Sequence, residues 1–205
     1  MSESIYGNYR DTLEKVMTDL VSMIEAINQE TKAETGEPLY EHLIYRIKDD
    51  GSMREKCSRK GLPVSSKSAL TDIKDAIGLR IVTGFIEDIY TCIEKIRAFP
   101  GVSILEEKDY ITHVKPNGYR SYHLILEMKV PYEDVLGRNP GTYYAEIQLR
   151  TIAMDSWASL EHQLKYKHAI KNEKLIVSEL KRAADELASC DVSMQTIRHL
   201  IHDED

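Results

Sequence analysis

The alternation of residue types between positions 143 and 151 constrains the fold of this chain more than any other feature. Glu146, Gln148 and Arg150 are separated by the apolar Ile147 and Leu149. A repeat of two residues is the pattern of a β-strand that buries one of its faces. The other face of this strand offers a carboxylate, an amide and a guanidinium. We therefore predict a sheet with a polar face that can bind a metal ion or phosphate groups.

Strand and helix patterns on both sides of this segment define the fold class. Further strands are predicted over residues 79–82, 102–110 and 122–130, with a short element over 39–47. Helices are predicted over 13–27, 86–99 and from residue 151 onward. The residues Ser52-Met-Arg-Glu55 predict a capping box at the start of another short helix. This order indicates an α+β fold with a mixed β-sheet of about five strands flanked by helices.

The C-terminal part of the chain has only helical patterns. The helix from residue 151 is expected to place four apolar side chains on its inner face: Ala153, Trp157, Leu160 and Leu164. From residue 171 the apolar residues continue at helical spacing and predict one or two amphipathic helices. We assign residues 1–170 to the main domain and 171–205 to a C-terminal helical extension, for which we expect a role in oligomerisation.

The charge balance narrows the classes of ligand. The chain has 205 residues and a net charge of −7, which gives no support for general binding of polyanions such as nucleic acid. Phosphate binding therefore requires a local basic site. The first residues have no signal-peptide pattern, and no apolar run has the roughly 20 residues that a membrane span needs, so we expect a cytoplasmic protein.

Four cations around a predicted strand and the next short helix form the first candidate site: Arg46, Lys48, Lys56 and Arg59. They can converge on a polyphosphate, because arginine pairs bidentately with phosphate oxygens and lysine acts as a point charge. The alternative is a solvated helix face, and the residues taken alone favour that alternative.

Asp75 and Glu146 form a candidate carboxylate pair. Each flanks or lies in a predicted strand, and two close carboxylates can bind Mg²⁺ together with substrate phosphates. One of them can also act as a general base toward a hydroxyl. Asp75 can instead be an N-cap beside the Gly78 turn. For Glu146 a purely structural role is less favoured, because a buried glutamate needs a partner.

The Pro-Asn-Gly turn before Tyr119 is the third candidate. A turn of this kind can present the Tyr119 ring for stacking on a base, with Lys115 before it and His123 after it. The alternative is a hairpin whose tyrosine packs internally. A zinc site is not expected, because no spacing among the candidate histidines fits one: His113, His123, His162 and His168.

Four segments together resemble a known family. They are Asp75-Ala-Ile-Gly-Leu-Arg80, Gly118-Tyr-Arg-Ser-Tyr-His123, Glu146-Ile-Gln-Leu-Arg-Thr151 and Trp157-Ala-Ser-Leu-Glu-His162. In this order and spacing they resemble the RelA/SpoT-type (p)ppGpp synthetases. The chain length is similar to that of the single-domain small alarmone synthetases of the RelQ group. The resemblance covers about residues 40 to 170 and implies a nucleotidyltransferase-like synthetase fold for residues 1–170.

The resemblance also implies an activity and a set of site residues. Members of this family use Mg²⁺ and transfer pyrophosphate from ATP to the ribose 3′-hydroxyl of GDP or GTP. The implied ATP-binding residues are Arg46, Lys48, Lys56, Arg59 and Arg80. Of these, Arg46 and Arg80 are implied to enclose the adenine. The implied metal ligands and catalytic residues are Asp75 and Glu146, with Glu146 as the base. The implied GDP or GTP site comprises Lys115, Tyr119, His123, Gln148, Arg150 and Glu161, with Tyr119 stacked on guanine.

The chain departs from the RelQ group at the positions that bind an activator there. RelQ-like enzymes are tetramers whose central cleft binds pppGpp, and the resemblance implies a homotetramer here. The matching positions in this chain are Glu25, Asn28, His42 and Asp155. An acidic cleft repels a polyphosphate, so we do not expect strong activation by pppGpp.

Two other functions remain open from the sequence. A pyrophosphokinase can use another acceptor such as tRNA, but a net charge of −7 argues against binding of tRNA. A non-catalytic regulator that binds nucleotides or RNA is the second alternative. Such a protein has no need for the pair of Asp75 and Glu146.

Overall fold

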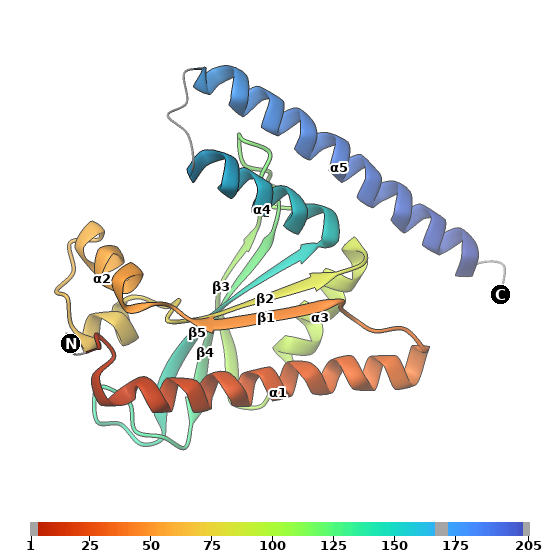
Figure 1. Ribbon diagram of the computed structural model, residues 1–205. Coiled ribbons are helices and arrows are strands. Elements are labelled where there is room, and N and C mark those ends of the chain that lie inside the picture. The colour runs from red at the N-terminus through yellow and green to blue at the C-terminus, as the bar shows by residue number, and fades with distance from the viewer. Residues whose placement is uncertain (1–3, 167–171, 203–205) are drawn as a thin grey trace.

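One mixed sheet organises the protein. The computed structural model describes residues 4–166 and 172–202. The five strands are β1 (His42–Ile47), β2 (Ile77–Thr83), β3 (Val102–Asp109), β4 (Tyr122–Val130) and β5 (Gly141–Thr151). They lie in the order β1-β2-β5-β4-β3, with β2 parallel to β5 and the other neighbours antiparallel (Figure 1). The α+β fold with a mixed five-stranded sheet is confirmed.

The register of β5 brings its neighbours' polar residues to one place. Arg80 of β2 and His123 of β4 both pair with Gln148, on either side of β5, and Gly78 of β2 pairs with Glu146. Along β5 the side chains of Ala145, Ile147 and Leu149 are buried, while Glu146 and Gln148 are only partly so. The period-two pattern of the sequence therefore holds in the structure. The polar groups of β2, β4 and β5 share one face of the sheet.

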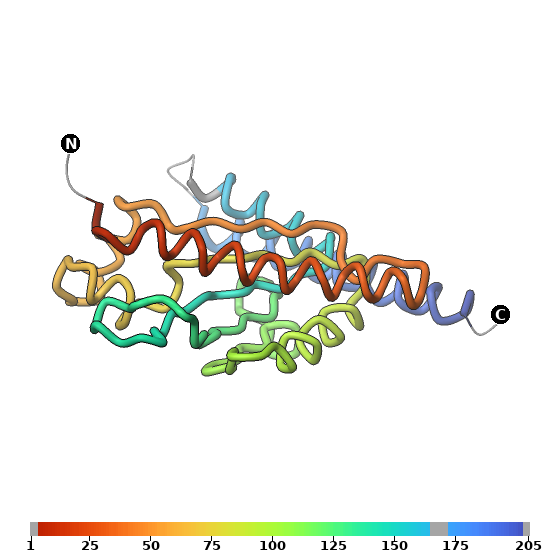
Figure 2. Tube along the Cα trace, turned by 90° about the horizontal axis from the view of Figure 1, so that it is seen from below, coloured from red at the N-terminus to blue at the C-terminus, as the bar shows by residue number. Residues whose placement is uncertain are grey.

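The opposite face of the sheet carries the hydrophobic core. Helix α1 (Arg10–Thr35) runs below the sheet, and α3 (Ile86–Arg97) lies beside it (Figures 1 and 2). Their buried side chains pack with those of the strands in one cluster. Helix α1 ends where Gly36 adopts φ 83°, a left-handed conformation that glycine adopts without steric cost. One sheet face is thus closed, and the other is free to hold a site.

Helix α2 (Asp50–Arg59) begins earlier than the sequence predicts. Its N-cap is Asp49, whose carboxylate accepts a hydrogen bond of 3.0 Å from the backbone N–H of Ser52. The predicted capping box at Ser52 is therefore wrong. Asp49 is the residue in extended conformation, so its side chain satisfies the first free N–H groups. Two short elements complete this region: the 3₁₀ turn Gly7–Tyr9 and the π-helical segment Ser68–Asp72.

Helix α4 (Ile152–Tyr166) lies on the open side of the sheet, and α5 (Glu173–His202) packs against it (Figure 1). Trp157 is buried as predicted, but Leu160 and Leu164 are exposed. The expected inner face of α4 is therefore wrong beyond Trp157. Within the described residues, the apolar cluster that α4 shares with α5 is centred on Trp157 and includes neither Leu160 nor Leu164. The proposed domain boundary at 170/171 lies outside the described residues.

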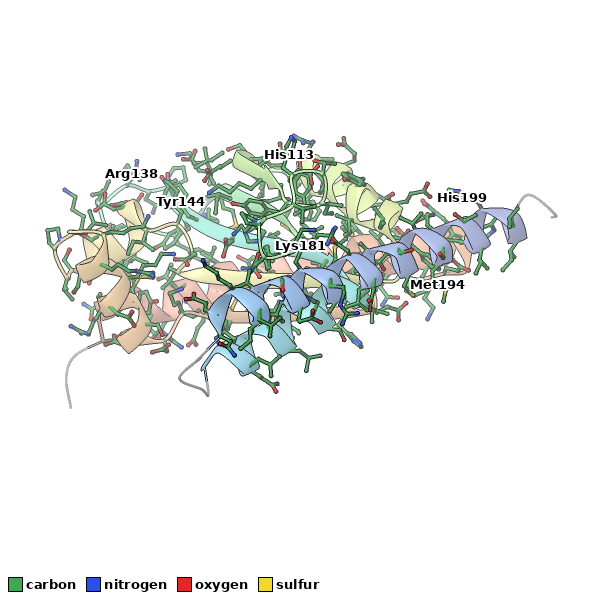
Figure 3. The ribbon with its side chains drawn as sticks, turned by 90° about the horizontal axis from the view of Figure 1, so that it is seen from above. His113, Arg138, Tyr144, Lys181, Met194 and His199 are labelled. Carbon is green, nitrogen blue, oxygen red and sulfur yellow. The ribbon has the colours of Figure 1, made fainter. Side chains whose placement is uncertain are left out.

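The two halves of α5 differ in their surroundings. Figure 3 looks down on the helix from Lys181 to Met194 and His199. In the first half, Ile176, Leu180 and Leu187 join the cluster around Trp157. In the second half, the large apolar residues are exposed: Val192, Met194, Ile197, Leu200 and Ile201.

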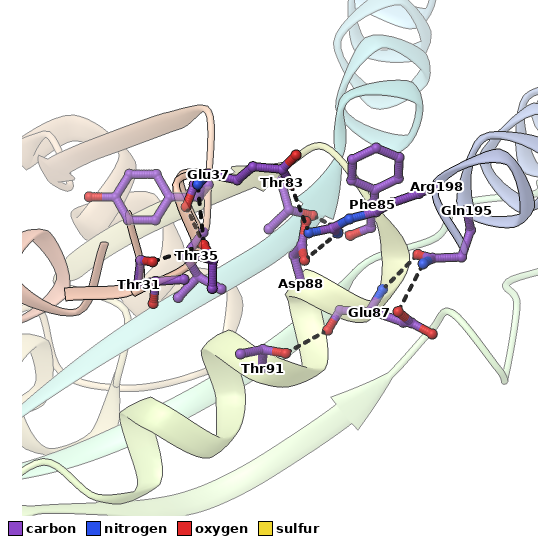
Figure 4. A network of polar contacts seen from close by, with 12 residues as sticks. Thr31, Thr35, Glu37, Thr83, Phe85, Glu87, Asp88, Thr91, Gln195 and Arg198 are labelled. Carbon is purple, nitrogen blue, oxygen red and sulfur yellow. Dashed lines mark hydrogen bonds and ion pairs between the residues drawn. The ribbon is translucent and has the colours of Figure 1, made fainter. Parts of the chain in front are cut away.

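Polar contacts hold the second half of α5 to the core. The guanidinium of Arg198 donates to Asp88 at 2.7 Å and to Glu37 at 3.2 Å, and lies 4.4 Å from the centre of the Phe85 ring. Gln195 donates to Glu87 at 2.8 Å (Figure 4). These contacts join α5 to the start of α3 and to the α1–β1 connection. No helix in the described part of the chain is long and apolar enough to cross a membrane.

Candidate active site

A pocket opens on the polar face of the sheet where β1, β2 and β5 meet. Six of the residues singled out from the sequence line it: Arg46, Lys48, Asp75, Arg80, Glu146 and Gln148. They come from β1, β2 and β5, from the residue that follows β1 and from the segment before β2. The parallel pairing of β2 with β5 brings Asp75 and Glu146 into the same pocket, although they are far apart along the chain.

Asp75 is the most strongly engaged carboxylate of the pocket. Its Oδ2 accepts hydrogen bonds from the ammonium groups of Lys48, at 3.0 Å, and Lys56, at 2.5 Å. Burial by itself raises the pKa of Asp75, but the hydrogen bonds and charges of the two lysines outweigh burial and hold the pKa below its ordinary value. The other oxygen, Oδ1, is buried and has no hydrogen-bond partner among the described residues.

Arg80 presents a second unpartnered group to the same pocket. Its Nε is buried and has no acceptor within the described part of the protein. Burial, followed by the charge of Arg150, lowers the pKa of the Arg80 guanidinium. A buried donor or acceptor without a partner is costly, and few such groups occur in native structures. Asp75 and Arg80 therefore mark a place where a polar ligand completes the site.

Glu146 lies between the pocket and the next group of polar residues. Its carboxylate contacts Nδ1 of His123 at 3.3 Å and accepts a hydrogen bond of 3.3 Å from Gln148. Burial raises the pKa of Glu146, but the hydrogen bond and charge of His123, together with Gln148, lower it below its ordinary value. The nearby charge of Asp75 acts in the opposite direction. Glu146 is thus held ionised.

Five side chains form a closed hydrogen-bonded ring beside the pocket. From Glu146 the contacts continue through His123 to the Tyr119 hydroxyl, which lies 2.8 Å from Nε2 of His123. Arg150 donates to that hydroxyl at 2.9 Å and to Oε1 of Gln148 at 3.0 Å. Gln148 then returns to Glu146. The ring fixes the orientation of the candidate base and of the candidate stacking tyrosine together.

Asp155 belongs to this site, which the sequence analysis did not foresee. It lies in the first turn of α4 and accepts from Arg150 at 2.8 Å, while Arg80 is 3.2 Å away. The carboxylate joins the two arginines across β2 and β5. From the sequence, Asp155 is expected in an activator cleft, as one of the groups that make that cleft acidic. Two guanidinium groups neutralise it here, and only its position early in α4 hinted at this role.

The remaining predicted residues differ in how closely they join the site. Nζ of Lys115 lies 4.8 Å from the centre of the Tyr119 ring and 4.2 Å from that of Tyr110. Glu161 of α4 accepts a hydrogen bond of 3.2 Å from Asn117, which lies between Lys115 and Tyr119 in the connection from β3 to β4. Lys56 reaches the site through Asp75. Arg59, at the end of α2, is exposed and is not among the residues that line the pocket.

The carboxylates fit a magnesium ion better than a zinc ion. Residues 4–166 and 172–202 contain no group of three or more histidine, cysteine or acidic side chains that could hold a metal. Mg²⁺ does not need such a group, because it uses one or two carboxylates and fills its shell with water and phosphate oxygens. The unpartnered Oδ1 of Asp75 in the same pocket as Glu146 suits that mode of binding. His168 lies outside the described residues.

The other positions matched to the activator cleft differ in exposure. Glu25 and His42 are exposed. Asn28 is partly buried, and its side-chain oxygen accepts from the backbone N–H groups of Leu39 at 2.7 Å and Tyr40 at 3.2 Å. Asn28 thus holds the α1–β1 connection, and its amide oxygen is already engaged.

Comparison with known proteins places this geometry in a family. A family model described as "Region found in RelA / SpoT proteins" matches residues 45–171. The chain is 42% identical over 159 residues to the GTP pyrophosphokinase YwaC of Bacillus subtilis, covering 78% of this chain and 74% of that protein.

Solved structures agree with the sequence comparison. A GTP pyrophosphokinase family protein from Streptococcus pneumoniae superposes with a TM-score of 0.80 at 30% identity, covering 96% of this chain and 94% of the other. The small alarmone synthetase 1 of Bacillus subtilis, solved bound to its product pppGpp, has a TM-score of 0.76 at 32% identity, covering 94% of each chain. The sequence and fold comparisons agree, and the chain belongs to the RelA/SpoT family.

Proposed function

We propose that this chain is a GTP/GDP pyrophosphokinase, which transfers pyrophosphate from ATP to the ribose 3′-hydroxyl of GDP or GTP to make (p)ppGpp. Membership of the RelA/SpoT family and relatives named GTP pyrophosphokinases support this activity. One observation carries it in the structure. A buried anionic acceptor of Asp75 and a buried cationic donor of Arg80, each without a partner among the described residues, line the same pocket.

The β1–β2 side of the pocket is the proposed ATP site. Arg46 and Arg80 line it, and guanidinium groups stack on purines and pair with phosphates. Lys48 and Lys56 are held beside them by Asp75, where their charges can meet a triphosphate. Arg59, exposed at the end of α2, is the outermost member of this proposed set. The excess of cations makes the pocket locally basic within a chain of net charge −7.

Asp75 and Glu146 are the proposed holders of Mg²⁺. A bound Mg²⁺ neutralises negative charge on the transferring phosphoryl group and orients the substrate oxygens. Within this chain, Oδ1 of Asp75 is available for such a ligand, and its Oδ2 remains tied to the two lysines.

The side facing Tyr119 is the proposed GDP or GTP site. In this proposal the Tyr119 ring stacks on guanine. The rest of the acceptor is bound by Lys115, Gln148, Arg150 and Glu161. Glu146 is the proposed base for the 3′-hydroxyl, and His123 holds its carboxylate in place. Because the pKa of Glu146 lies below its ordinary value of 4.5, loss of rate through its protonation is expected only as the pH falls below that value.

The substitution Glu146→Gln tests the activity and the role of the base together. It removes one metal ligand and the proton acceptor, so (p)ppGpp synthesis is expected to fall by about two orders of magnitude or more. Labelled ATP, Mg²⁺ and GDP or GTP are incubated with the protein, and the products are separated by chromatography. Glu127→Gln is the matched control. Glu127 of β4 lies on the same face of the sheet as Glu146 but does not line the pocket. Equal activity in both variants would remove Glu146 from the mechanism. Labelled transfer to tRNA in place of GDP or GTP would identify a different acceptor.

Assembly and location complete the proposal. The exposed apolar residues in the second half of α5 offer a surface for other subunits, and we propose a homotetramer. We place the enzyme in the cytoplasm, because ATP and guanine nucleotides are supplied there. The pair of Asp75 and Glu146 argues for catalysis over passive nucleotide binding.

A further inference from the structure

Helix α5 lies directly against the loop that carries Tyr119. The Tyr119 loop, residues 115–121, connects β3 with β4 and contains Gly118, which has φ +91°. A Cβ atom at Gly118 would lie 2.6 Å from Cβ of Ala184 and 3.1 Å from Cα of Lys181. Real side chains do not approach so closely, so only glycine allows this contact. The loop and α5 therefore touch backbone against side chain, with no room between them.

Arg120 ties the two elements together. Its guanidinium donates to the backbone oxygen of Gly118 at 3.2 Å, to the backbone oxygen of Ala184 at 3.2 Å and to Oδ1 of Asp185 at 2.9 Å. The side chain is only 16% exposed, although its partner Asp185 is 44% exposed. One arginine thus holds its own loop and the middle of α5 at the same time. It does not line the pocket of Asp75 and Glu146.

A second set of contacts couples the same part of α5 to the Tyr119 ring. Trp157 of α4 donates through Nε1 to the backbone oxygen of Leu180 at 2.8 Å. The ring centres of Trp157 and Tyr119 are 6.4 Å apart, and Tyr119 packs against the small cluster formed by Trp157, Leu180 and Ala184. Tyr119 is therefore held by its hydroxyl in the polar ring and by the packing of its aromatic ring against the cluster between α4 and α5.

We propose that Arg120 is a positioning residue for the guanine nucleotide, and that α5 sets acceptor affinity through it. This inference rests on the proposed function of the Tyr119 loop as part of the GDP or GTP site. The loop has no regular secondary structure apart from a turn at Pro116 and Asn117, and Lys115 and Pro116 are exposed. A loop that is not held in its binding conformation must be ordered when the ligand arrives, and that ordering weakens binding. Arg120 orders the loop before the nucleotide binds, because it fixes the loop to α5, a helix that does not line the ATP pocket.

The test compares Arg120→Ala with Arg182→Ala. Arg182 lies on the outer side of α5, has a side chain that is 67% exposed and, among the described residues, pairs with Glu179 and Glu186 of its own helix. The two variants lose the same charge, but only Arg120→Ala unties the loop. For Arg120→Ala the KM for GDP or GTP is expected to rise about three- to tenfold, with the KM for ATP within about twofold of wild type. Arg182→Ala is expected to change neither value.

Binding provides a readout that does not depend on turnover. Trp157 is the single tryptophan of the chain and lies beside Tyr119, so its fluorescence reports on this cluster. GDP is titrated with and without a non-hydrolysable ATP analogue. Arg120→Ala is expected to raise the Kd for GDP by the same factor as the KM for GDP or GTP. If GDP binds in this Arg120-dependent manner but no (p)ppGpp forms, the positioning role stands and the proposed activity fails.

Two further variants separate positioning from folding. Arg120→Lys keeps one cation at the loop and is expected to recover part of the acceptor affinity. Asp185→Asn removes the charged partner but leaves the contact with Ala184, and is expected to give a smaller loss. Thermal melts show whether each variant is folded. Equal changes in the KM values for GDP and ATP, or unchanged GDP affinity in folded Arg120→Ala, would overturn the proposal.

Discussion

Replacing Tyr119 by alanine removes the ring that is proposed to stack on guanine. In the free protein this ring is partly buried, with its centre 6.4 Å from that of Trp157 and with Nζ of Lys115 at 4.8 Å. Its hydroxyl also belongs to the ring of hydrogen bonds through His123 and Arg150. These hydroxyl contacts exist before the nucleotide arrives. Their loss therefore affects stability more than acceptor affinity.

The expected change in affinity follows from what differs between the free and bound states. Stacking of a base on an aromatic ring contributes about 1–3 kcal/mol. A partly exposed cation over the ring, as Lys115 is here, contributes about 0.5–1 kcal/mol in the free state and is displaced when the base stacks. The midpoints of these two ranges differ by about 1.25 kcal/mol, which corresponds to a factor of about eight in affinity. Tyr119→Ala is expected to raise the acceptor KM by that factor.

Steady-state rates measured at saturating Mg²⁺ and ATP, with varied GDP or GTP, give the acceptor KM, and the reverse arrangement gives the KM for ATP. Tyr119→Phe is the matched control, because it keeps the ring and loses only the hydroxyl. Its acceptor KM should stay within about twofold of wild type, since the hydroxyl contacts are common to both states. A Tyr119→Ala variant whose two KM values rise together would refute stacking and leave Tyr119 as a packing residue.

Three further predictions concern the metal, the arginine pair and regulation. Asp75→Asn should raise the Mg²⁺ concentration needed for half-maximal rate at fixed ATP, and an unchanged Mg²⁺ dependence would remove Asp75 as a ligand. Asp155→Asn leaves Arg80 and Arg150 without their shared carboxylate and should lower the free energy of unfolding in urea by about 1–3 kcal/mol, since one partner of a partly buried ion pair is lost. Added pppGpp should leave the synthesis rate nearly flat at saturating substrates, because the acidic Glu25 is at a position matched to the activator cleft and repels a polyphosphate, and stimulation of several-fold would contradict this.

The strands were predictable because their information is local. The alternation of Glu146 and Gln148 with buried neighbours needs only a period of two, and the structure keeps it. The meeting of Asp75 with Glu146 depends on the pairing of β2 with β5, which no single segment encodes. Resemblance to a family supplied what local pattern did not. The pocket they share agrees with that expectation.

The errors arise where two arrangements fit the same local pattern. Asp49 and Ser52 are both good N-caps. The helix begins after Asp49, because the Asp49 carboxylate accepts a hydrogen bond from the backbone N–H of Ser52. Along α4, Leu160 and Leu164 continue a helical stripe, yet both are exposed, and among the described residues the cluster between α4 and α5 forms around Trp157 instead. The role of Asp155 depends on how α4 leaves β5 relative to Arg80, which is a tertiary relation. No spacing in the sequence encodes it.

The place of β5 within the sheet has a consequence for the order of synthesis. It is the last strand to leave the ribosome, yet it lies in the middle, between β2 and β4. A nascent chain that ends before β5 has no Glu146 and lacks the strand that joins the β1–β2 pair to the β3–β4 pair. Insertion of β5 joins the two pairs and brings Glu146 to Asp75 in a single event. Such long-range pairing is slow to form, so the proposed site, which needs both Asp75 and Glu146, is complete only when the sheet is whole.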